Sequence, residues 1–135
     1  MDTNKIIIIL EGISFAYRGS SLIFDRFDFE FKQGDRIGLI GPNGSGKTTL
    51  FHIMIGLLKP MWGSVTAFGK TRIKEIDFRE MRKDIGLLFQ DADDQLFCPT
   101  ATEDIAFGPL NLGKSHDEVR EIVEHTLEIL ELKGF

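Results

Sequence analysis

Cysteine is scarce in this sequence, with Cys98 the only one among 135 residues. A single thiol excludes an internal disulfide and indicates a reducing compartment. No basic residue adjoins Cys98, so we interpret it as a small apolar filler and not as a reactive thiol. The three histidines, His52, His116 and His125, are not spaced as metal ligands.

The sequence also lacks runs of positive charge and long apolar segments. The net charge is −5, without a cluster of lysine or arginine, so nothing in the charge pattern favours nucleic acid as a partner. The longest uninterrupted aliphatic run, residues 6–10, is far shorter than a membrane span of about 20 residues and does not resemble a signal peptide. We therefore expect a cytosolic chain that forms one domain or part of one.

The sequence does contain a phosphate-binding loop. Residues 41–48 read Gly-Pro-Asn-Gly-Ser-Gly-Lys-Thr and match the pattern G-x-x-x-x-G-K-[ST]. Residues 37–40 form the short apolar run of a buried parallel strand, and residues 48–58 carry apolar side chains at the spacing of one helix face. This order of strand, loop and helix aims backbone N–H groups at a phosphate. The sequence therefore predicts a nucleoside triphosphate site.

Shorter patterns predict an antiparallel region before the loop. Residues 5–11 and 13–17 are predicted to form two paired strands, and residues 27–31 alternate phenylalanine with charged residues, as a strand with one buried face does. The connections are too short for crossover helices, so we expect antiparallel pairing. Another short strand is predicted at residues 65–68.

Further elements are predicted downstream of the loop. Asp77, with Glu80 three residues later, resembles a capping box that begins a short helix. Residues 85–89 are a second candidate for a buried strand. Ser115 and Glu118 form another capping-box pattern before an amphipathic helix.

The loop residues have distinct expected roles. The glycines let the backbone approach the phosphates, Lys47 reaches the β and γ oxygens, and the Thr48 hydroxyl ligates Mg²⁺. The metal shell and the attacking water need further groups. Glu11 ends an apolar run, but it precedes the loop and is a poor candidate, whereas Gln90 follows a predicted core strand and offers a neutral oxygen.

On these motifs the sequence resembles the amino-terminal half of an ABC transporter ATPase, over nearly the whole chain. The matching segments are residues 41–50, 56–60 and 63–65, together with residues 86–90, which resemble the Q-loop of that family. The segments Asp-Gln-Leu-Phe at residues 94–97 and Thr-Glu-Asp-Ile-Ala-Phe-Gly-Pro at residues 102–109 resemble more specifically the cobalt/nickel and energy-coupling-factor importers.

The resemblance implies an α/β fold with three parts. Residues 32–62 and 73–90 would form a P-loop core with a partial parallel sheet and helices. Residues 1–31 and 63–72 would form the antiparallel β part. Residues 91–135 would hold the Q-loop region and the start of a helical subdomain.

The resemblance also implies ATP and Mg²⁺ as cofactors. Tyr17 matches the aromatic that stacks on adenine, Thr48 and Gln90 match metal-contacting residues, and Gln90 matches the sensor of the γ-phosphate or its water. The residues implied for ATP binding are Tyr17, Gly41, Pro42, Asn43, Gly44, Ser45, Gly46, Lys47, Thr48 and Thr49.

The function that the resemblance implies is that of an energising subunit. Such a subunit powers an importer for a metal ion such as cobalt or nickel, or for a vitamin. It would pair with a second ATP-binding subunit, as a homodimer or a heterodimer, and contact an integral membrane permease through the region after Gln90. It would then lie in the cytoplasm, peripherally on the cytoplasmic face of the cell membrane. Leu96 and Phe97 fit either that contact or a core.

Other motifs of the family are not in this sequence. There is no Leu-Ser-Gly-Gly-Gln signature, no Walker B run ending in acid after the loop, and no matching switch histidine. We therefore expect a truncated half of a domain that binds ATP weakly, hydrolyses little of it alone and leaves an apolar sheet edge open. Two alternatives stay open: a non-catalytic nucleotide-binding remnant or regulatory module, and a different P-loop NTPase that uses Asp91 or Asp93 for metal.

Overall fold

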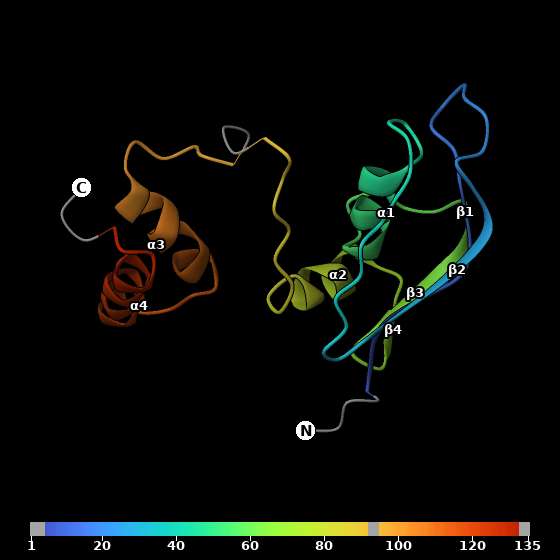
Figure 1. Cartoon of the computed structure of the whole chain (residues 1–135). Helices are drawn as coiled ribbons and strands as arrows, with labels where there is room; N and C mark the ends of the chain where they lie inside the picture. The colour runs from blue at the N-terminus through green and yellow to red at the C-terminus, as the bar shows by residue number, and fades with distance from the viewer. Residues whose placement is uncertain (1–4, 92–94, 133–135) are drawn as a thin grey trace. The chain divides into compact units, whose positions relative to one another are not determined.

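The structure, a computed structural model, describes residues 5–91 and 95–132, and the predictions for Asp93 and Asp94 lie outside them. Helices and strands both occur, which confirms the α/β class (Figure 1). The elements are β1 (Ile6–Phe15), β2 (Phe24–Lys32), α1 (Lys47–Met54), β3 (Trp62–Ala67), β4 (Lys70–Arg72), α2 (Glu75–Met81), α3 (Ala101–Asn111) and α4 (His116–Ile129). None of the described helices is long and apolar enough to cross a membrane.

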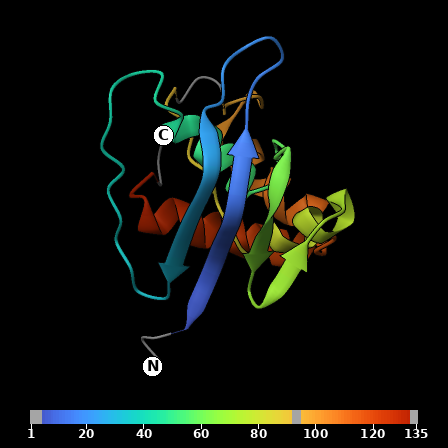
Figure 2. The same cartoon turned by 90° about the vertical axis from the view of Figure 1, so that its right-hand side faces the viewer.

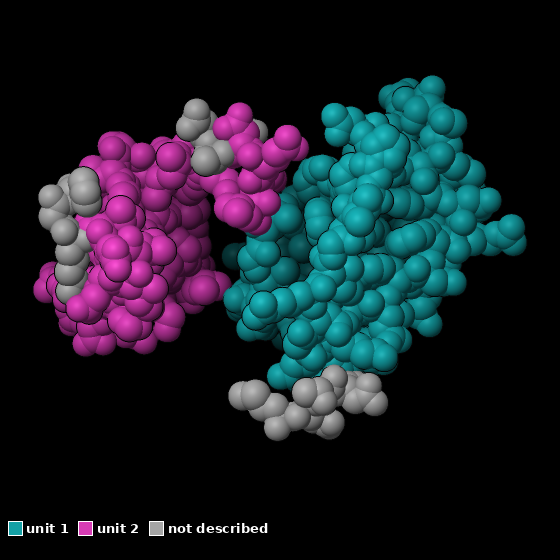
Figure 3. Space-filling model, viewed as in Figure 1, with its two compact units in different colours: residues 1–87 teal, residues 88–135 magenta. Residues whose placement is uncertain are grey.

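The chain divides into two compact units, which are described separately. Unit 1 comprises Met1–Leu87 and unit 2 comprises Leu88–Phe135 (Figure 3). Unit 1 contains the sheet, α1, α2 and the phosphate-binding loop. Unit 2 contains α3 and α4.

The sheet of unit 1 has four antiparallel strands in the order β2-β1-β3-β4 (Figure 2). The prediction of two separate strands before residue 17 was wrong, because β1 runs continuously from Ile6 to Phe15. Gly12, at φ 60°, lies where the pairing with β2 shifts register between Leu10 and Ile13. This irregularity lets one strand bend without ending.

The predicted alternation in β2 is present in the structure. Phe27 and Phe29 are partly buried and pack against the core, whereas Asp28 and Glu30 are exposed. Side chains of a strand point alternately to its two faces, so one face of β2 contributes to the core and the other meets solvent.

Helices α1 and α2 lie on the same side of the sheet (Figure 1). Their apolar faces join the inward side chains of β1 and β3 in one core cluster, which includes Leu10, Ile13, Leu50, Ile53, Val65, Ala67, Phe78 and Met81. Helix α1 ends at Met54, several residues before the predicted end at residue 58. Gly56 then adopts φ 74°, and any β-carbon there would collide with the ring of Phe78, so the chain turns away where α1 meets α2.

The beginning of α2 differs from the prediction. The helix starts at Glu75, and Asp77 is its third residue and not the capping residue before it. The Asp77 carboxylate accepts hydrogen bonds from the backbone N–H groups of Lys74 at 2.8 Å and Ile73 at 3.1 Å. These bonds hold the pKa of Asp77 below its ordinary value.

The predicted parallel strands at residues 37–40 and 85–89 are not formed. These segments have no regular strand structure, and Ile37 and Ile40 are exposed. A parallel strand needs hydrogen-bonded neighbours and cover on both faces. In the part of the chain that the structure describes, every strand belongs to the antiparallel sheet, so the P-loop core is present without its parallel sheet.

Unit 2 is built on two capped helices. The predicted capping box of Ser115 and Glu118 begins α4. Helix α3 begins with a capping box that the sequence analysis missed, in which Thr100 and Glu103 bond each other's backbone N–H groups. The pattern Thr-x-x-Glu was available as a signal for this helix start.

Candidate nucleotide-binding site

The loop before α1 has a backbone shape that requires glycine at two positions. Gly44 and Gly46 have φ values of 82° and 93°, in the left-handed region that other residues rarely adopt. Gly46 is also the residue that precedes α1, and a β-carbon there would lie 2.5 Å from Cγ2 of Ile23 and 3.1 Å from Cζ of Phe24. Ile23 and Phe24, where β2 begins, therefore pack closely against Gly46.

Lys47 folds back over the loop. Its Nζ donates hydrogen bonds to the carbonyl oxygens of Gly41 at 2.8 Å and Pro42 at 2.9 Å. The Ser45 N–H donates to the same Pro42 carbonyl at 3.2 Å. The Lys47 side chain thus reaches from the start of α1 back to the first two residues of the loop.

The first turn of α1 favours an anion. It contains no acidic residue, and its N–H groups have no partners within the helix because they precede the first full turn. Thr48 is exposed beside Lys47, whereas Thr49 is buried. Backbone N–H groups, an ammonium and a hydroxyl form a donor set that suits a phosphate chain with its Mg²⁺, so the residues present fit ATP–Mg²⁺.

Tyr17 lies beside the first turn of α1. Its hydroxyl is within hydrogen-bond distance of Thr49 Oγ1, at 3.1 Å. Its ring packs edge-on against Phe15, with centroids 5.1 Å apart, and remains 46% exposed. The structure therefore brings Tyr17 together with the helix that follows the loop, a contact that the sequence pattern did not predict.

Gln90 belongs to unit 2, where it is exposed just after the boundary at Leu87. Its predicted role at the metal and the γ-phosphate stays a prediction, as does the alternative use of Asp91. Among the described residues, no group of three or more histidine, cysteine, aspartate or glutamate side chains is placed to hold a metal ion. Thr48 and the phosphates would be ligands of a metal at this site, and Gln90 stays the predicted further ligand.

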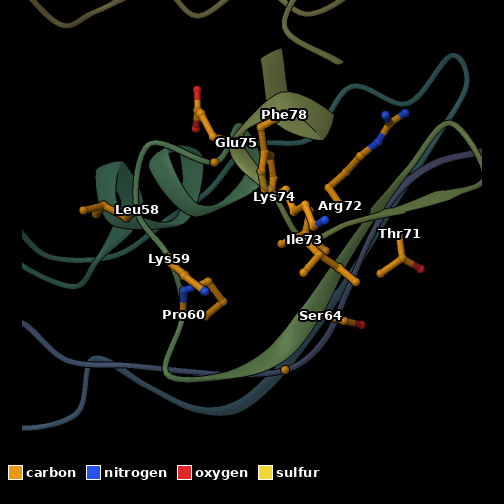
Figure 4. A pocket seen from close by; sticks show the side chains of 13 residues that line it. Leu58, Lys59, Pro60, Ser64, Thr71, Arg72, Ile73, Lys74, Glu75 and Phe78 are labelled. Atoms are coloured by element: carbon orange, nitrogen blue, oxygen red, sulfur yellow. The ribbon is translucent and has the colours of Figure 1, made fainter. Parts of the chain in front are cut away.

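A separate pocket of about 620 Å³ lies elsewhere in unit 1. Figure 4 shows Leu58, Lys59 and Pro60 on one side of it and the residues from Thr71 to Lys74 on the other. None of the residues predicted to bind ATP lines this pocket. The loop at residues 41–49 therefore remains the candidate site.

The comparison with protein families gives the class of this protein. The family described as "ABC transporter" matches residues 24–134, which include the loop, α1 and all of the later helices. The chain belongs to the ABC transporter family.

Two relatives extend the match over nearly the whole chain. An ABC transporter ATP-binding protein of Nitratidesulfovibrio vulgaris is 48% identical over 134 residues, which is 98% of this chain and 49% of the relative. The energy-coupling factor transporter ATP-binding protein EcfA of Methanocaldococcus jannaschii is 40% identical over 130 residues, covering 96% of this chain and 47% of the relative. The chain thus spans about half the length of these curated relatives.

A solved structure supports the same fold. The protein cbiO1 of Clostridium perfringens, described as part of the ABC transporter complex cbiONQ, superposes with a TM-score of 0.79 at 30% identity. The match covers 93% of this chain and 50% of cbiO1. The predicted resemblance to the amino-terminal half of an ABC ATPase is therefore confirmed.

Proposed function

We propose that this chain binds ATP with Mg²⁺ through the loop at residues 41–48. The observation that carries this proposal is the conformation of the loop. Lys47, at the start of α1, folds back onto the carbonyls of Gly41 and Pro42, and the first turn of α1 contains no acidic residue. Gly44 and Gly46 adopt left-handed φ values. Lys47 and the loop N–H groups would hold the phosphates, Thr48 would ligate Mg²⁺, and Tyr17 would stack on the base. Bound Mg²⁺ would neutralise phosphate charge.

ATP binding and hydrolysis by a subunit of this kind would drive an importer. The similarity to EcfA, an energy-coupling factor transporter protein, and to cbiO1, part of an ABC transporter complex, supports this proposal. The transported solute would be a metal ion such as cobalt or nickel, or a vitamin.

The partners would be a second ATP-binding subunit and an integral membrane permease. Leu96 and Phe97 are 62% and 63% exposed, which favours the interpretation of this segment as a contact surface over that of a core. The protein would then lie peripherally on the cytoplasmic face of the cell membrane.

The test is the affinity of the chain for a fluorescent ATP analogue with Mg²⁺. Replacing Lys47 with alanine removes charge-assisted hydrogen bonds, so we expect affinity to fall by about tenfold or more. Lys59→Ala, which removes a lysine outside the loop, is the matched control and should bind like the wild type. Equal affinity of Lys47→Ala and Lys59→Ala would contradict the proposal.

ATP hydrolysis by the chain alone is expected to be slow, because the sequence lacks the signature, Walker B and switch-histidine motifs. Phosphate release by the purified chain measures this. Fast turnover that disappears in Lys47→Ala would show that this chain contains a complete catalytic site.

A further inference from the structure

A hydroxyl–hydroxyl hydrogen bond joins two parts of the proposed ATP site. The Tyr17 hydroxyl and Thr49 Oγ1 are 3.1 Å apart, although the residues are 32 positions apart in sequence. Tyr17 follows β1, and Thr49 lies in the first turn of α1, two residues after Lys47. The bond therefore links the residue proposed to stack on the base with the helix that carries the phosphate-binding lysine.

The supports of the Tyr17 ring are themselves fixed. Phe15 and Thr49 are buried, with 5% and 6% of their surfaces exposed. The rings of Phe15 and Tyr17 meet edge-on with an interplanar angle of 86°. The Tyr17 carbonyl accepts hydrogen bonds from the N–H and the hydroxyl of Ser20, at 3.0 and 2.9 Å, which fix the turn after it. Phe15 and Thr49 thus hold the ring and its hydroxyl, Ser20 fixes the backbone after it, and part of the residue stays open to solvent.

We propose that Thr49 is a positioning residue for base recognition, which acts by holding the Tyr17 ring in place through this hydrogen bond. The inference rests on the proposed function and assigns a role to Thr49 within it. A ring that is already oriented loses less freedom when a base stacks on it, so the bond increases affinity for a nucleotide. Inorganic tripolyphosphate has no base, so the orientation of the ring does not change its affinity.

The experiment compares affinities for Mg²⁺–ATP and Mg²⁺–tripolyphosphate, both measured by displacement of a fluorescent ATP analogue. Thr49→Val and Tyr17→Phe each remove the bond, and each should lower affinity for ATP by about two- to tenfold, the effect of one neutral hydrogen bond. The loss for tripolyphosphate should be smaller. The double variant should lose no more than either single variant, and Thr49→Ser should retain the affinity of the wild type.

A matched control exists in the β3–β4 hairpin. Thr66 and Thr71 form a similar hydroxyl–hydroxyl bond of 3.2 Å outside the site. Thr71→Val removes that bond and should leave ATP affinity unchanged. Tyr17 is the only tyrosine, so the ring signals of a tyrosine-labelled sample report on the bond directly. They should shift in Thr49→Val and stay unchanged in Thr71→Val.

Three results would overturn the inference while leaving the proposed function in place. They are an equal loss for ATP and tripolyphosphate in Thr49→Val, unchanged ATP affinity in Tyr17→Phe, and fully additive losses in the double variant. A wild-type chain that binds neither ligand would instead contradict the proposed function, and this inference with it.

Discussion

Unit 1 and unit 2 bury their apolar side chains very differently. In unit 1 the sheet, α1 and α2 share one core, in which Leu10, Ile13 and Ile53 are 0% exposed. Among the described residues of unit 2, only Val119 and Val123 are buried hydrophobics, and α3 buries no residue. The loop at residues 41–48 therefore belongs to the unit with the larger core, whereas unit 2 leaves apolar side chains such as Leu96 and Phe97 exposed.

The largest expected effect comes from creating a cavity in the core of unit 1. Ile53→Ala removes a fully buried side chain and should lower the free energy of unfolding of unit 1 by about 2 to 5 kcal/mol. Hydrogen exchange, measured for each unit, should show lost protection in the strands and α1. Val123→Ala is the matched change in unit 2 and should weaken protection in α3 and α4 alone. Loss of protection in both units from either variant would contradict the division into two cores.

Replacing one glycine in each unit should distinguish the cost of a steric collision from the cost of backbone strain. Gly46→Ala combines a left-handed φ with the collision against Ile23, and should cost about 1 to 3 kcal/mol and weaken ATP binding. Gly113→Ala, between α3 and α4, has φ 78° but no atom within 4 Å of the added carbon. It should cost less and leave ATP affinity unchanged. Thermal unfolding and nucleotide titration measure both, and equal losses would argue against packing at Gly46.

The aromatic pair of unit 2 should make a smaller contribution. The rings of Phe97 and Phe107 meet edge-on with centroids 4.5 Å apart. A double-mutant cycle of Phe97→Ala and Phe107→Ala, followed by denaturant unfolding, should give a coupling of about 0.5 to 1.5 kcal/mol. Leu112→Ala removes an exposed apolar side chain and serves as the control. A coupling near zero would show that the pair does not order the chain before α3.

The smallest effect should be a pH dependence that both units share. The Ser115 N–H and hydroxyl donate to the Glu118 carboxylate at 2.9 and 2.8 Å and lower the pKa of Glu118, as backbone N–H groups lower that of Asp77. A lowered folded-state pKa gives stabilisation that is full at neutral pH and is lost as the pH falls through that pKa. Glu118→Gln should flatten the acid loss of helix signal in circular dichroism, and Asp77→Asn should do so separately. Unchanged acid titrations would contradict this.

The loop is the part of the candidate site that the sequence could predict, and its role in binding stays a prediction. The motif needs only glycines, a lysine and a hydroxyl within eight residues, so neighbouring residues are enough to predict the candidate loop. Capping boxes are equally local, and the one at Ser115 was predicted correctly. The helix start at Thr100 carried the same signal and was missed.

The parts that failed depend on distant residues. Residues 37–40 have the composition of a buried strand, but composition cannot supply the neighbouring strands that a parallel sheet needs. The hydrogen bond between Tyr17 and Thr49 joins residues far apart in sequence, and no periodic pattern in the sequence predicts it. Strand β1 continues past Gly12 through an irregularity in its pairing with β2, which shifts register there and at two other points.

The two hydrogen bonds from Lys47 to the loop carbonyls occupy the ammonium group that the proposed ligand would need. To bind the Lys47 ammonium, a phosphate would have to interact with it more favourably than the carbonyl oxygens of Gly41 and Pro42 do. A single small anion offers few oxygens for that exchange, whereas a triphosphate can engage the ammonium and the loop N–H groups together. In the proposed site, these bonds would compete with the ligand for the ammonium and so would favour long phosphate chains over free phosphate.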